Sequence, residues 1–97
     1  MRARLEDIIY KLEKCYDVSM DVKYIGQFNV YEVKASIGRF NKSCYIDNIL
    51  YGEWPDEQLS NWLEDNCVWP VIKAYRRSIG EYILSDFVVE EKEKNNA

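Results

Sequence analysis

The 97-residue chain contains no histidine. Histidine is the side chain that most often acts as general base, metal ligand or charge-relay partner near neutral pH. Its absence excludes Ser-His-Asp and Cys-His catalytic arrangements and histidine-ligated metal centres. Glycine and proline are scarce as well, with four and two residues. Because the four glycines are isolated, the sequence has no glycine-rich phosphate-binding loop, and we expect neither an enzyme nor a bound cofactor.

Cysteine is also sparse, and its three residues, Cys15, Cys44 and Cys67, are widely spaced. They form none of the closely spaced pairs that bind zinc or exchange disulfides. We interpret them as buried thiols of a protein in a reducing compartment. The sequence shows neither a signal peptide nor an apolar run long enough to cross a membrane, so we expect a cytoplasmic protein without a membrane partner.

The composition is nevertheless that of a folded domain. Apolar residues make up 47% of the chain and aromatic residues 14%, and the net charge is −4. A chain of this length forms one small domain. We expect a single domain over residues 1–89 and a disordered charged tail, EEKEKNNA, over residues 90–97.

Periodicity predicts one helix followed by a run of strands. Apolar residues from Arg4 to Tyr16 recur at i, i+3, i+4 and i+7, which predicts an amphipathic helix that leaves Tyr10 outside its apolar stripe. Three segments with a period of two follow, at residues 18–24, 28–37 and 40–46. The short connections between them predict an antiparallel meander.

Both prolines follow a tryptophan, and each Trp-Pro pair is typical of a helix start because proline suits the first helical position. We expect one helix over about 55–66 and a second over 70–79 that buries Val71, Ile72, Tyr75 and Ile79. For residues 82–89 a last strand and a continued helix both remain open, and we favour the strand.

Together these elements predict an α+β fold in the order α-β-β-β-α-α-(β). A three-stranded, or with residues 82–89 four-stranded, antiparallel sheet is covered on one face by the N-terminal helix and two C-terminal helices.

The order helix, three antiparallel strands, helix, over Arg4 to about Asn66, resembles the double-stranded-RNA-binding domain. The resemblance implies a basic cluster at the start of the second helix that grips phosphates across the RNA groove. The matching stretch here, Pro55-Asp56-Glu57-Gln58, is acidic and would repel phosphates. On the following helix Lys73, Arg76 and Arg77 are too few for a phosphate track, and we expect some of them to pair with the acidic helix. An RNA- or DNA-binding module that uses the strand aromatics with Lys73, Arg76 and Arg77 is therefore the alternative function rather than the favoured one.

Negative charge is concentrated in one segment of the chain. Residues 51–70 contain five acidic residues and no Lys or Arg, whereas the rest of the chain is close to neutral. Acidic residues near a helix start favour the helix dipole, which is one interpretation. The other is a docking face for a basic partner, since complementary charge speeds encounter and fixes orientation. The acidic residues are Glu53, Asp56, Glu57, Glu64 and Asp65.

Aromatic residues divide into two groups by position. Those at helical or strand spacing are expected in the core: Tyr16, Phe28, Trp62 and Tyr75. Those at element ends or on a polar face are equally suited to the core and to an interface: Tyr10, Tyr51, Trp54 and Trp69.

These features favour a small, acidic, non-catalytic protein-binding domain whose partner has a basic surface. By class-level analogy, such domains include inhibitors and adaptors of bacteriophages and mobile elements, in which an acidic face mimics nucleic acid. A third interpretation is a structural subunit that self-associates through Trp54 and Tyr10. The candidate binding residues are Tyr10, Trp54, Asp56, Glu57, Glu64 and Asp65.

Overall fold

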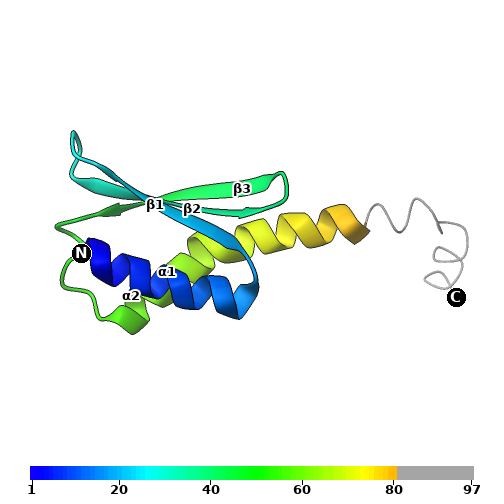
Figure 1. The fold of residues 1–97 in the computed structure, drawn as a ribbon, viewed down its shortest axis with the longest axis horizontal. Helices are drawn as coiled ribbons and strands as arrows, with labels where there is room; N and C mark the ends of the chain where they lie inside the picture. The colour runs from blue at the N-terminus through cyan, green and yellow to red at the C-terminus, as the bar shows by residue number, and fades with distance from the viewer. Residues whose placement is uncertain (81–97) are drawn as a thin grey trace, which may run out of the picture.

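The computed structural model of the chain describes residues 1–80 and has the expected α+β fold (Figure 1). The strand predicted at 82–89 and the tail at 90–97 lie outside the described residues. The elements, in chain order, are α1 (Arg2–Tyr16), β1 (Ser19–Ile25), β2 (Val30–Ile37), β3 (Phe40–Asp47), α2 (Asp56–Leu63), a π-helical turn η1 (Glu64–Val68) and a helix over residues 69–80.

The three strands form an antiparallel sheet in the order β1-β2-β3, as the short connections predict. Val22 lies opposite Val33, and Val33 lies opposite Cys44, so a single row crosses the sheet. The two-residue turn between β2 and β3 begins at Gly38, whose φ of 57° is costly for residues with a side chain. Alternation along the strands gives the sheet one apolar and one polar face.

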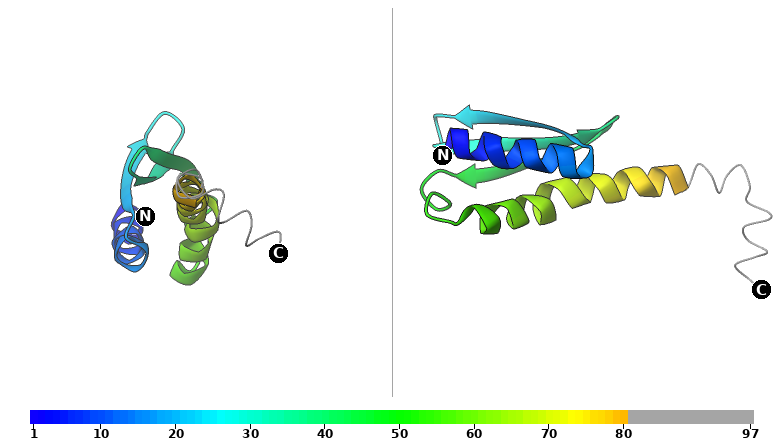
Figure 2. Two further views of the ribbon diagram at one scale, coloured as in Figure 1. Left: turned by 90° about the vertical axis from the view of Figure 1, so that its right-hand side faces the viewer. Right: turned by 60° about the horizontal axis from the view of Figure 1, so that its bottom comes forward.

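Helix α1 and the helical segment over residues 56–80 both cover the apolar face of the sheet (Figure 2). Helix α1 packs mainly against β1, and η1 lies against β2 and β3. Helix α1 is capped at its C-terminus by Asp17, which adopts a left-handed conformation and donates its backbone N–H to the carbonyl of Glu13.

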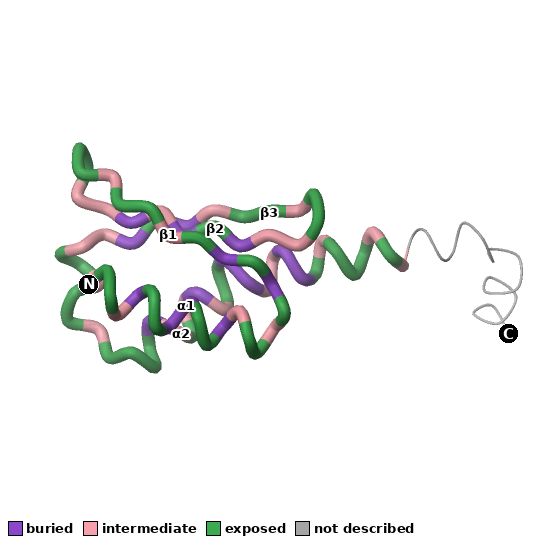
Figure 3. The backbone as a smooth tube through the Cα atoms, viewed as in Figure 1, coloured by how far each residue is buried: buried purple, intermediate pink, exposed green. Residues whose placement is uncertain are grey.

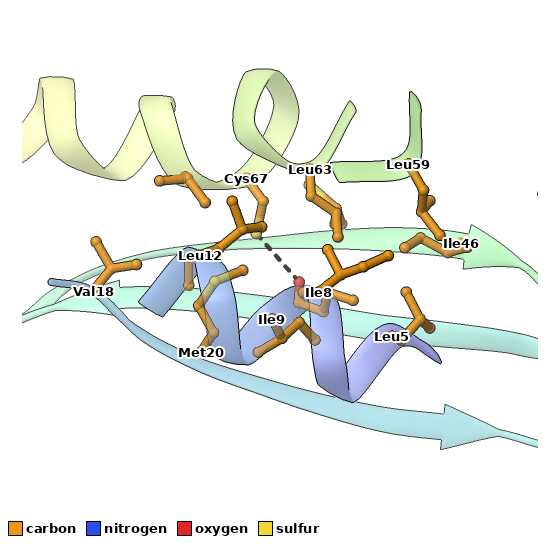
Figure 4. Packing of buried hydrophobic residues seen from close by; sticks show 14 of the residues in the cluster. Leu5, Ile8, Ile9, Leu12, Val18, Met20, Ile46, Leu59, Leu63 and Cys67 are labelled. Carbon is orange, nitrogen blue, oxygen red and sulfur yellow. Dashed lines mark hydrogen bonds between the residues drawn. The ribbon is translucent and has the colours of Figure 1, made fainter. Parts of the chain in front are cut away.

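The core lies between the sheet and the helices, and the buried stretches of the elements face one another (Figures 3 and 4). Burying large apolar side chains supplies most of the stability of such a domain, at about 1.5–3 kcal/mol per residue. The largest fully buried side chains are Leu5, Val33, Ile46, Leu59, Leu63, Cys67, Val68 and Val71.

The two predicted C-terminal helices form one continuous helical segment, joined by η1. Pro55 does precede a helix, as its N-cap residue, whereas Pro70 lies inside the segment. Proline normally interrupts a helix because it lacks an N–H and its ring crowds the carbonyl four residues earlier. Here the wider π-helical turn comes first, with the N–H of Trp69 bonded to the carbonyl of Glu64. The segment therefore passes Pro70 without a break.

Asn66, within this turn, takes part in two hydrogen bonds. The Sγ of Cys44 donates to the carbonyl of Asn66 at 2.8 Å, and the Asn66 amide donates to the carbonyl of Trp62 at 2.9 Å. Cys67 also points into the sheet, where its Sγ donates to the carbonyls of Lys42 and Val33 at 3.4 and 3.6 Å; Figure 4 shows the second bond. The thiols of Cys44 and Cys67 thus fasten the turn to β2 and β3.

Four expectations about burial are wrong. Phe28 is 66% exposed because it lies in the turn between β1 and β2 rather than in a strand. Tyr75 and Ile79 are more than one-third exposed, since the helix over residues 69–80 extends past the end of the sheet (Figure 1). Cys15 is exposed at the end of α1, while Cys44 and Cys67 are buried as expected.

Candidate functional site

A groove of about 250 Å³ separates α1 from the first turns of α2. Side chains of α1 form one wall, and side chains of the first two turns of α2 form the other. Because three of the four charged groups in the lining are carboxylates, the groove is acidic. Its lining residues are Asp7, Ile8, Lys11, Asp56, Glu57 and Ser60.

Asp56, the first acidic residue of α2, is neutralised within the domain. Its carboxylate forms an ion pair with the Nε of Arg4 from α1, and the same guanidinium donates to the carbonyl of Gly52 at 3.2 Å. Arg4 therefore ties α1 to the loop before α2. Asp56 contributes less to an external docking surface than its charge indicates.

Glu64 is half-buried in η1 and faces the end of α1. Partial removal from water and the nearby Glu64 carboxylate raise the pKa of Tyr16 above its ordinary value. The ring of Tyr16 also packs edge-on against Trp69, with centroids 5.4 Å apart. Glu64 thus belongs to the contact between the two helical segments.

Glu57 and Asp65 are exposed, and no ion pair of either is present in residues 1–80. Glu57 lines the groove at the start of α2, and Asp65 lies further along the same segment, beside Trp69 and Lys73 in a shallow pocket. The helix is continuous from residue 56 to residue 80, so Asp65 lies in its interior. Stabilisation of the helix dipole, which acts only in the terminal turns, therefore accounts for Glu57 but not for Asp65.

The two aromatic candidates, Trp54 and Tyr10, differ in their burial. Trp54 is half-buried and packs edge-on against Tyr51, with ring centroids 4.4 Å apart, so it helps to hold the loop before α2. Tyr10 is 59% exposed, as expected, and the Nζ of Lys14 lies 4.6 Å from its ring centroid. Neither residue lines the acidic groove.

At the other end of the sheet the structure adds Arg39, which was not predicted, to the basic group of Lys73, Arg76 and Arg77. Arg39, in the turn between β2 and β3, and Arg77, on the helix over residues 69–80, line one groove of about 300 Å³. Arg76 lies over the ring of Trp69, 5.8 Å from its centroid. In the described part of the chain no ion pair joins Lys73, Arg76 or Arg77 to the acidic residues. Only the fold brings Arg39 beside Arg77, because the two residues are far apart in sequence.

An exposed apolar cluster was also missed. Phe28, Ile49 and Leu50 are 66%, 75% and 72% exposed. Their loops are joined by Asn29 and Asn48, through a backbone bond of 3.1 Å and a side-chain bond of 3.1 Å. Asp47 before Asn48 is a sequence signal that could have indicated an ordered turn, since its carboxylate accepts the N–H groups of Ile49 and Leu50.

The contact between the two buried cysteines shifts their pKa values in opposite directions, down at Cys44 and up at Cys67. The contact with Cys44 and burial raise the pKa of Cys67, so its thiol stays protonated at neutral pH. No helix within residues 1–80 combines the length and the apolar character that a membrane crossing requires. Comparisons with protein-family models, with curated proteins and with solved structures find no match for this chain.

Proposed function

We propose that this protein is a non-catalytic protein-binding domain that docks a basic partner surface through the acidic side of α2 and η1. An inhibitor or adaptor of bacteriophage or mobile-element type, acting as a nucleic-acid mimic, is the class that fits this surface. The proposal places it in the cytoplasm, where its buried thiols remain reduced.

One observation carries the proposal: Glu57 and Asp65 remain exposed along a single helical segment, and Asp65 lies where the helix dipole cannot account for it. Carboxylates that already serve the fold, such as Asp56, are paired internally. Exposed carboxylates on a rigid helix suit recognition, since they raise the association rate of a basic partner and orient it.

The test is binding of a fluorescent lysine-rich helical peptide, measured by anisotropy over a series of salt concentrations. We expect Glu57→Lys combined with Asp65→Lys to weaken binding about tenfold at low salt, because each reversal replaces an attraction by a repulsion. The variant should also show a smaller salt dependence.

The matched control is Glu6→Lys combined with Glu13→Lys, which changes the net charge equally at two residues of α1 outside the groove. We expect this control to retain most of the affinity. Equal weakening by both variants would show that only net charge matters, and it would contradict a docking site on α2 and η1.

Nucleic-acid binding is the second candidate, and the groove between Arg39 and Arg77 favours it. Two guanidinium groups beside the ring of Phe40 offer both phosphate contacts and a stacking surface. This function predicts retention of a labelled oligonucleotide at low salt that is lost when Arg39 and Arg77 are changed to Ala. If the unchanged protein retains no oligonucleotide at low salt, nucleic-acid binding is excluded.

A further inference from the structure

Strand β1 is an edge strand in the described part of the chain. It pairs with β2 along one side through seven residues, and within residues 1–80 no strand lies along its other side. An edge of this length presents a row of backbone N–H and C=O groups that can pair with another strand. Figure 2 shows β1 at one side of the sheet, above α1.

Several features that normally prevent edge pairing are missing from β1. Its register with β2 is regular from Ser19 to Ile25, without a bulge. The strand contains no proline or glycine. Its only charged residues are Asp21 and Lys23, both exposed on the polar face of the sheet. They have opposite charges and lie on either side of Val22.

Because Asp21 and Lys23 lie on either side of Val22, β1 is complementary in charge to a second copy of itself. If two copies pair antiparallel about Val22, Asp21 of each lies opposite Lys23 of the other, and Met20 lies opposite Tyr24. Opposite charges at directly paired positions stabilise a sheet, and like charges destabilise it. Because the arrangement has twofold symmetry, the two Asp–Lys contacts form together.

The existing sheet extends this complementarity. Within one chain Lys23 lies opposite Glu32, and Asp21 lies opposite Lys34. The row across the paired sheets would therefore read Glu32, Lys23, then Asp21 and Lys34 of the second copy. Its charges alternate in sign without interruption.

The other edge strand of the described sheet, β3, is not complementary in charge to a second copy of itself. Its charged residues are Lys42 and Asp47, which lie on opposite faces because their numbers differ by an odd count. Antiparallel pairing of two copies with their helices on the same side never brings Lys42 opposite Asp47.

From these observations we propose that two copies of this chain associate through antiparallel pairing of β1 with β1 about Val22. The product is a dimer with a continuous six-stranded sheet whose helices lie on one face. This inference does not depend on the proposed acidic docking function, since α2 and η1 lie outside the contact.

The test uses charge-reversal variants of the full chain, analysed by light scattering and sedimentation over a concentration series. We expect the unchanged protein to reach twice the chain mass, and Asp21→Lys and Lys23→Asp each to dimerise about tenfold or more weakly. Mixing the two variants should restore the dimer, because the two lysines of one chain then face the two aspartates of the other. Asn41→Lys, on the same face but on β3, should leave the dimer intact.

Four results would overturn the proposal, and the first three concern the dimer itself. They are a monomer at all concentrations up to about 1 mM, a dimer that neither reversal weakens, and variants that fail to combine on mixing. Assemblies that grow beyond a dimer would also contradict it, since they indicate pairing of β1 with β3. Far-UV circular dichroism checks the fold of each variant, and if Asp21→Lys does not fold, the dimerisation of Lys23→Asp alone decides.

Discussion

The thiol of Cys44 in β3 donates a hydrogen bond to the carbonyl oxygen of Asn66 in η1, at 2.8 Å. Pro70, four residues after Asn66, has no N–H that could serve as the usual helical donor to this carbonyl. Cys44 therefore satisfies a backbone acceptor that the proline leaves without its regular partner, and it fastens the helical segment to the sheet at the same point.

Changing Cys44 to Ala should lower the free energy of unfolding by about 1–3 kcal/mol, because it leaves the Asn66 carbonyl without this donor. Urea unfolding measures the change. Cys15→Ala, at an exposed cysteine, is the control and should cost less than about 0.5 kcal/mol.

A second substitution tests whether Cys44 stabilises the protein through the Asn66 carbonyl. In a Pro70→Ala background residue 70 regains an N–H, so we expect the cost of Cys44→Ala to fall by about 0.5 kcal/mol or more. An identical cost in both backgrounds would show that Cys44 acts through packing and not through the Asn66 carbonyl.

Arg4 should matter more than its ion-pair partner. Arg4→Ala removes the pair with Asp56 and the bond to the Gly52 carbonyl, so we expect a loss of about 1 kcal/mol in unfolding free energy. Asp56→Asn removes only the ion pair, in which the Asp56 side chain is exposed, and should cost about 0.5 kcal/mol or less. Urea unfolding of the two variants distinguishes them, and a larger loss for Asp56→Asn would contradict this order.

Gly52 lies in a close contact within the loop before α2. A Cβ at this position would lie 2.7 Å from the carbonyl oxygen of Asn48, a backbone atom that cannot move aside alone. Gly52→Ala should therefore destabilise the protein by about 1–3 kcal/mol, measured by thermal unfolding. Gly26→Ala is the control, since its Cβ would meet only the Tyr24 ring at 3.4 Å. An equal loss for both variants would show that Gly52 is not specially constrained.

Tyr16 should ionise at higher pH in the folded protein than in the unfolded chain, because its surroundings raise its pKa. The stabilisation linked to its protonated form is complete below pH about 10 and is lost as the pH rises through the raised pKa. We expect Glu64→Gln to lower the pKa of Tyr16 while burial still holds it above the ordinary value. Tyrosine-ring NMR follows the titration, and an unchanged pKa in Glu64→Gln would remove Glu64 as a cause.

Local pattern predicted most of the fold. The apolar spacing in α1 and the alternation in β2, where Tyr31, Val33 and Ala35 are buried, report directly which face meets the core. The concentration of acid in residues 51–70 was also visible in the sequence. What the pattern could not show was how each carboxylate is used, because Arg4 and Asp56 are 52 residues apart.

The sequence by itself determined the helix, the three strands, their antiparallel order and the local excess of negative charge, since these depend on neighbouring residues and short turns. Only the tertiary structure decided that Pro70 lies inside a helix, because the thiol that compensates for the missing hydrogen bond comes from β3. It also decided that Phe28 is exposed, that Arg39 lies beside Arg77, and that β1 lies at an edge of the described sheet. These properties depend on contacts between residues far apart in the chain, which no local period encodes.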